Sequence, residues 1–113
     1  MIPDRDVLDL RGRPRRLKEF RRRAHVILYW DPAADVEAWT KARQAESQRW
    51  IWLQAELLRP AAPPADFGPG IHLVSRWGNL IASLPSTPWD TERIEEELLR
   101  FEARDSCDLG AAP

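Results

Sequence analysis

The stretch AHVILYWDPAADVEAW, residues 24–39, decides the fold that the sequence predicts. Its first part is apolar almost without interruption and includes β-branched and aromatic residues, as expected of a strand that is covered on both faces. Asp31 is then a favoured residue type for a helix N-cap. Pro32 suits the first helical position, because the N–H that proline lacks needs no partner there. The stretch therefore predicts a strand over 24–30, followed at once by a helix over about 31–49.

Shorter patterns on both sides predict the remaining elements. Gly12 lies between two short runs that are typical of a hairpin, and residues 50–58 are rich in β-formers, although they could also continue the preceding helix. We expect a strand there, because a second apolar run must pair with the first. The expected elements are a hairpin over 7–17, a helical turn over 18–22, strands over 24–30, 50–58, 71–75 and 79–84, a proline- and glycine-rich loop over 59–70, and helices over 31–49 and 87–104.

The last expected helix has its own start signal and apolar stripe. Thr87 is predicted as its N-cap, Pro88 as its first residue, and Asp90 as the acidic residue of a capping-box-like start. Consecutive helical residues point in different directions, so Glu95 to Glu97 are expected to form a solvated face and not a catalytic carboxylate pair. The residues expected on the buried stripe are Ile94, Leu98 and Phe101, with Leu99 beside them.

Length and composition limit the class of protein. A chain of 113 residues with 43% hydrophobic residues can bury one core, so we expect a single domain over 1–105 and a disordered tail over 106–113. No apolar run approaches the roughly 20 residues that a membrane-spanning helix needs, and the first residues contain no apolar signal-peptide segment. These observations predict a cytoplasmic protein without a membrane partner.

Charge is unevenly distributed, although the formal net charge is only -1. Residues 11–23 are rich in arginine and are opposed within that segment only by Glu19, whereas residues 90–108 are mainly acidic. One interpretation is two solvated faces that attract each other across the fold. The other is a basic surface for a partner, and nucleic acid is one such partner, because arginine-rich segments bind phosphate.

Three stretches carry a resemblance to a known family. LDLRGRPRRLKEFRRRAHVILYW, residues 8–30, has a hairpin with a turn glycine, a Leu-x-x-Phe turn and a central apolar strand. Trp30 is followed by a helix start, and PGIHLVSRWGNLIASLP, residues 69–85, has a proline, a strand, a turn glycine and a returning strand. In these features the chain resembles the redoxins, the thioredoxin-like group that includes the thiol peroxidases. The resemblance implies a pared-down thioredoxin-like α/β fold, with a central mixed β-sheet, an N-terminal hairpin and flanking helices.

The departures from the family concern its chemistry. The resemblance places the Cys-x-x-Cys motif directly after Trp30 and a cis-proline at Pro69, but no cysteine occupies the motif or residues 35–40. At this position the carboxylate of Asp31 is expected to act as a structural helix cap, and a residual cleft around Trp30, Asp31 and Pro69 is the alternative. The four former active-site positions are Asp31, Pro32, Ala33 and Ala34.

Other candidate residues have structural interpretations. Cys107 is the single thiol and lies between two aspartates, so we expect an incidental cysteine. His25 and His72 are expected as core or edge residues of strands, with no metal site and no cofactor. Trp77 follows Arg76 in a predicted turn, and Trp89 lies at the start of the last helix. Tryptophan and arginine dominate protein–protein hot spots, so Trp30, Arg76, Trp77 and Trp89 are the predicted binding residues.

These observations favour a non-catalytic thioredoxin-like domain that binds a protein partner or assembles with itself. Two alternatives remain. One is a nucleic-acid-binding protein that uses residues 11–23, and the other is a thiol redox protein that works through Cys107 with a partner's cysteine.

Overall fold

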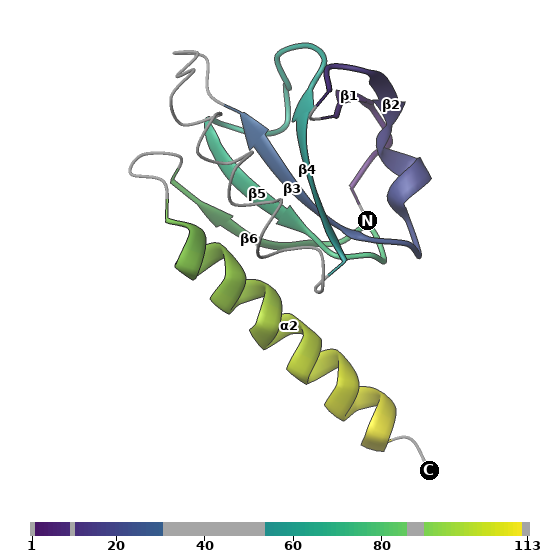
Figure 1. Ribbon diagram of the computed structural model, residues 1–113, viewed down its shortest axis with the longest axis vertical. Coiled ribbons are helices and arrows are strands. Elements are labelled where there is room, and N and C mark those ends of the chain that lie inside the picture. The colour runs from purple at the N-terminus through teal and green to yellow at the C-terminus, as the bar shows by residue number, and fades with distance from the viewer. Residues whose placement is uncertain (1, 10, 31–53, 86–89, 112–113) are drawn as a thin grey trace.

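A computed structural model of the chain describes residues 2–9, 11–30, 54–85 and 90–111, with 103–111 described by their backbone alone. These residues form a small α/β domain with a mixed six-stranded sheet, a short 3₁₀ helix and one α-helix (Figure 1). The strand order is β2-β1-β4-β3-β5-β6. The elements are β1 (Asp6–Leu8), β2 (Pro14–Arg16), η1 (Leu17–Phe20), β3 (His25–Trp30), β4 (Ala55–Pro60), β5 (Gly70–Val74), β6 (Leu80–Leu84) and α2 (Thr91–Ala111).

The pairing of the strands confirms the predicted N-terminal hairpin and mixed sheet. β1 pairs antiparallel with both β2 and β4, and the centre of the sheet is the parallel pair of β3 and β4. β5 continues the sheet antiparallel to β3, and β6 is antiparallel to β5. A parallel pair needs a crossover connection. Residues 31–53 make that connection, and the helix predicted within them lies outside the described residues.

β3 separates two hydrophobic clusters, as its near-continuous apolar sequence predicts. Ile27 and Tyr29 lie in one cluster together with Ile94 and Leu98 of α2. Val26 and Leu28 alternate with them and lie in the other cluster, which includes Leu17 and Phe20 of η1. The strand is therefore buried on both faces, because α2 covers one side of the sheet and η1 with the N-terminal segment covers the other.

Several predicted boundaries are wrong. β4 ends at Pro60, beyond the predicted end at residue 58, because β1 pairs with its last residues: Val7 lies opposite Pro60 and Leu8 opposite Arg59. The proline-rich loop therefore begins at residue 61, where the N–H of Ala61 donates to the carbonyl of Asp6. Residues 50–53 of the predicted strand lie outside the described residues.

The final helix also differs from the prediction. Helix α2 begins at Thr91, and Asp90 precedes it as a cap: its carboxylate accepts from the N–H of Arg93 at 3.1 Å. Thr87 and Pro88, the predicted start, lie outside the described residues. The helix continues to Ala111, beyond the predicted end at residue 104. The sequence predicts more than one helix beside the sheet. In the described part of the chain α2 is the single α-helix, so this prediction is not supported there.

Candidate functional site

The position predicted for a former active site lies at one end of β3. Trp30, the last residue of β3, is half-buried and pairs with Gly70, the first residue of β5. This register brings Trp30 next to Pro69, which directly precedes Gly70 in the chain. Two of the three residues of the predicted cleft are therefore neighbours. Asp31, the third, and residues 32–34 lie outside the described part of the chain.

Gly70 fixes the close approach of β5 and β6 at this end of the sheet. Its φ is +145°, which side-chain-bearing residues rarely adopt, and a Cβ there would lie 2.7 Å from the carbonyl oxygen of Leu84. The neighbouring surface has a depression, open to solvent, between the start of β5, the end of β6 and the start of α2. It is lined by Ile71, Leu84, Pro85, Asp90, Arg93 and Ile94.

His72 anchors the loop before Gly70. Its Nε2 lies 2.9 Å from the carbonyl oxygen of Gly68, and its Nδ1 lies 2.9 Å from the hydroxyl of Ser83. The carbonyl can only accept, so Nε2 donates to it, and Nδ1 is hydrogen-bonded to the hydroxyl of Ser83. The ring of Phe67 stacks on His72 at 4.7 Å. With both ring nitrogens bonded and 6% of the residue exposed, His72 is the buried strand histidine that the sequence predicts.

A polar cluster around a buried histidine joins the sheet to α2, and the sequence did not predict it. His25 is fully buried at the start of β3, and its Nδ1 accepts from the backbone N–H of Arg76 at 3.0 Å. Its Nε2 contacts the carboxylate of Glu102 on α2, which also forms an ion pair with the guanidinium of Arg76. The ring of Phe101 packs edge-on against His25 at 5.5 Å. Because 77 positions separate His25 from Glu102, no local pattern could have joined them.

The charges of this cluster favour ionised Glu102. Burial opposes the charged form, but the hydrogen bond from His25 and the positive charge of Arg76 outweigh it and lower the pKa of Glu102 below 4.5. Arg76, predicted as a binding residue, is therefore engaged within the fold. The cluster holds α2 on the sheet, and the full burial of His25 leaves its ring without access to a substrate.

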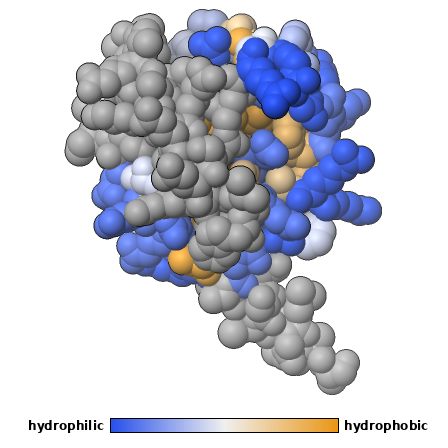
Figure 2. Space-filling view, in the orientation of Figure 1, coloured by the Kyte–Doolittle hydropathy of each residue, from blue (hydrophilic) through white to orange (hydrophobic). Residues whose placement is uncertain are grey.

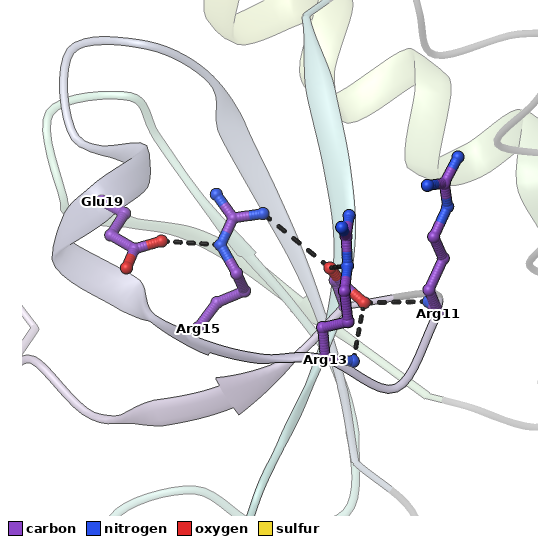
Figure 3. Close-up of polar contacts among 5 residues, drawn as sticks. Arg11, Arg13, Arg15 and Glu19 are labelled. Atoms are coloured by element: carbon purple, nitrogen blue, oxygen red, sulfur yellow. Dashed lines mark hydrogen bonds and ion pairs between the residues drawn. The ribbon is translucent and has the colours of Figure 1, made fainter.

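The arginine-rich hairpin is organised by Asp9 (Figure 3). One carboxylate oxygen of Asp9 accepts from the backbone N–H groups of Arg11 and Arg13, each at 2.9 Å, and the other contacts the guanidinium groups of Arg13 and Arg15. Arg15 also bonds Glu19 at 2.7 Å. Burial opposes ionisation of Asp9, but the N–H groups of Arg13 and Arg11 outweigh it and lower its pKa. Backbone bonds from Gly12 to the carbonyl of Asp9 and from Asp9 to the carbonyl of Arg13 close the same turn, and the Asp9 side chain reinforces them.

Glu19 is the only acidic residue within 11–23, but carboxylates outside these residues also oppose the basic segment. Arg16 forms ion pairs with Asp4 at 2.7 Å and with Asp6 at 2.9 Å, and Asp4 also accepts from the backbone N–H of Lys18. These carboxylates precede the segment in sequence, so a count within residues 11–23 omits them. In the described part of the chain, the ion pairs of this segment are to the local carboxylates of Asp4, Asp6, Asp9 and Glu19.

Trp77 is the predicted binding residue that the structure places on the surface. It lies in the β5–β6 turn and is 44% exposed, and Leu80, which opens β6, is 46% exposed. Leu99 on α2 is the third large hydrophobic residue exposed among the described residues. On the face shown in Figure 2, the described surface is mainly hydrophilic, with small hydrophobic areas between. Trp89 lies outside the described residues.

No protein-family model matches the chain, and no curated protein matches its sequence. Within the described ranges, no three side chains of histidine, cysteine, aspartate or glutamate gather in a way that could hold a metal ion. None of the described helices has the length and apolar character needed to cross a membrane.

Proposed function

We propose that this chain is a non-catalytic, thioredoxin-like domain that binds a protein partner or assembles with itself. The element order supports the family part of the proposal: a hairpin, a central strand, a parallel neighbour, an antiparallel strand pair and a closing helix follow one another as the resemblance implies. The register of Trp30 with Gly70, next to Pro69, is a second supporting feature.

The exposed indole of Trp77 is the observation that carries the binding part of the proposal. Hydrogen bonds order the turn that holds it: the Ser75 hydroxyl accepts from the N–H groups of Trp77 and Asn79, each at 3.2 Å. A backbone bond from Gly78 to Ser75 and a second from Ser75 to Asn79 close the same turn. A large aromatic side chain on a pre-ordered turn loses little conformational entropy when it is buried by a partner.

The sequence disfavours thiol chemistry at the position where the family performs it. The chain has a single cysteine, Cys107, and residues 31–34 contain none. Cys107 falls in the last part of α2, whose side chains lie outside the described residues. A redox function would need this thiol and a cysteine from another protein, so replacement of Cys107 by serine is its direct test.

The experiment that tests the proposal is purification of the tagged chain from its native host at low salt, with and without nuclease. We expect a stoichiometric protein partner or a defined homo-oligomer that survives nuclease. Trp77→Ala should weaken the assembly at least about tenfold, which corresponds to roughly 1.4 kcal/mol. Leu99→Ala, an exposed residue of similar apolar character on α2, serves as the matched control. A monomer with no bound protein would contradict the proposal.

Nucleic-acid binding is the second candidate, and the exposed arginines favour it. Arg11 joins the Asp9 cluster through its backbone N–H while its guanidinium points away from it (Figure 3), and Arg22 and Arg23 are exposed. Against it, Arg13, Arg15 and Arg16 already contact carboxylates. Nucleic acid that leaves the purified protein with nuclease or added salt, and that Arg22→Ala with Arg23→Ala reduces, would favour this candidate.

A further inference from the structure

The two edges of the described sheet differ in chemistry. β2 forms one edge with the sequence Pro14-Arg15-Arg16, and proline and charged side chains are the usual means of blocking further strand pairing. β6 forms the other edge with the uncharged sequence LIASL, residues 80–84. Alternate backbone N–H and C=O groups of an edge strand point away from the sheet and can pair with another strand. Within the described part of the chain, β6 is therefore the edge strand that lacks these blocking residues.

From this edge, we infer that the partner in the proposed assembly is a second copy of the chain, paired antiparallel through β6 about a two-fold axis. The inference rests on the proposed binding function and specifies its partner. The sequence of β6 begins and ends with leucine, so antiparallel pairing centred on Ala82 places Leu80 opposite Leu84 of the other copy. A two-fold axis gives a closed dimer, and the blocked β2 edge prevents head-to-tail growth of the sheet.

The charge pattern favours a second copy over a different partner. A two-fold axis brings like residues close together, so charged residues beside it would repel their own copies. Residues 77–89 are the longest stretch of the sequence without a charged residue, in a chain in which 31% of residues are charged. The exposed side chains of Trp77 and Leu80 lie in this stretch. The uncharged edge is thus suited to pair with itself.

The local geometry limits the strength of this pairing. The pairing of β5 with β6 shifts register between Leu73 and Val74, opposite the first residues of β6, and a bulge of this kind twists an edge and weakens pairing. A five-residue strand also buries a small area. We therefore expect a reversible dimer with a dissociation constant on the order of 10 to 100 µM.

The first test is the concentration dependence of mass for the full chain, measured by sedimentation equilibrium from low micromolar to near-millimolar protein. We expect a monomer–dimer equilibrium in the wild type. Leu80→Lys should raise the dissociation constant at least about tenfold, because it places an ammonium group on each copy at the uncharged edge. Leu99→Lys, an equally exposed change on α2, should leave the constant unchanged, and circular dichroism should confirm that both variants fold.

The second test addresses the register. Ala82→Cys in a Cys107→Ser background should form an intermolecular disulfide under mild oxidation, because pairing about Ala82 places the two Cα atoms about 4.5 to 5.5 Å apart, within disulfide range. Leu99→Cys in the same background is the control and should remain reduced for much longer. A dimer that forms in the Leu80→Lys variant and does not cross-link through residue 82 would overturn this inference while leaving the proposed assembly function standing.

The remaining outcomes distinguish the β6 dimer from the proposed binding function. A chain that stays monomeric at every concentration but retains a different protein through Trp77 would overturn the inference and support the proposed function. A chain that stays monomeric and retains no protein would contradict both.

Discussion

Asp9 shows how one short side chain fixes a turn in this protein. Its carboxylate accepts two backbone N–H groups of the hairpin loop and contacts two arginines, although its side chain remains 12% exposed. Backbone donors that lose such an acceptor must turn to water or remain unpaired. The hairpin places β1 beside β4, so the turn affects the whole sheet.

Asp9→Ala should therefore lower the free energy of unfolding by about 1 to 2 kcal/mol, as expected when a side chain that caps backbone donors is removed. Urea denaturation followed by circular dichroism measures the change. Asp9→Asn is the control, because its amide oxygen can still accept from both N–H groups, and it should lose less than half as much. Equal losses in the two variants would mean that the charge, and not the acceptor geometry, stabilises the turn.

Gly70 is a residue that no side chain can replace without strain. Gly70→Ala should destabilise the protein by about 1 to 3 kcal/mol from its backbone conformation alone, and contact with the Leu84 carbonyl should add to this. Thermal and urea unfolding measure the loss. Gly68→Ala is the matched control two positions away, because a Cβ there meets no atom within 4 Å. If the two variants were equally stable, the close approach of β5 and β6 would not be required.

At the scale of the element, α2 packs against the sheet through both apolar and polar side chains. Ile94 and Leu98 are fully buried, as the periodicity predicts, and Phe101 is partly buried beside His25. Glu102 then adds polar contacts to the sheet that no helical pattern could indicate. An apolar stripe defines which face of a helix is covered. The residues that meet that face depend on the sheet behind it.

The lowered pKa of Glu102 predicts a specific pH dependence. A carboxylate with a depressed folded pKa contributes its full stabilisation above its unfolded value, here 4.5, and loses it as the pH falls through the folded value. Glu102→Gln should cost roughly 1 to 2 kcal/mol at pH 7. Its difference from the wild type should shrink below pH 4.5, as measured by urea denaturation across the acid range.

Glu96→Gln controls for a general loss of negative charge on α2. Glu96 is 67% exposed and pairs with Arg100 at 3.3 Å, so this change should alter stability by less than about 0.5 kcal/mol. A difference between wild type and Glu102→Gln that stayed constant down to pH 3 would show that the charge of Glu102 does not hold the helix.

At the scale of the whole molecule, β4 links both hydrophobic clusters. Leu57 and Leu58 are adjacent, fully buried, and belong to opposite faces of the sheet. Because the sheet is shared, the two clusters should unfold together even though their side chains do not mix.

Leu57→Ala and Leu58→Ala should each lower the stability of one cooperative transition by about 2 to 5 kcal/mol. Circular dichroism and tryptophan fluorescence should report the same midpoint in both variants. Two separate transitions in either variant would contradict a single folding unit.

The sequence predicts more of the fold than of the candidate site. β3, β5, β6 and the hairpin follow from apolar runs and turn residues, because these signals are local. The end of β4 at Pro60 does not, since its pairing with Val7 crosses most of the first half of the chain. Arg76 was predicted as a binding residue from its residue type and its place in a turn. Its ion pair with Glu102 depends on where α2 packs.

The sequence by itself determined that β3 side chains alternate between two clusters and which stripe of α2 is buried. It also determined the positions of the turn glycines and excluded a cysteine directly after Trp30. Only the tertiary structure decided which arginines are paired, which histidine contacts α2, and which strands form the edges of the sheet. The physical reason is the separation along the chain over which each kind of interaction acts. Propensity and periodicity act over a few residues, whereas ion pairs, buried polar contacts and strand order join residues that the chain separates widely.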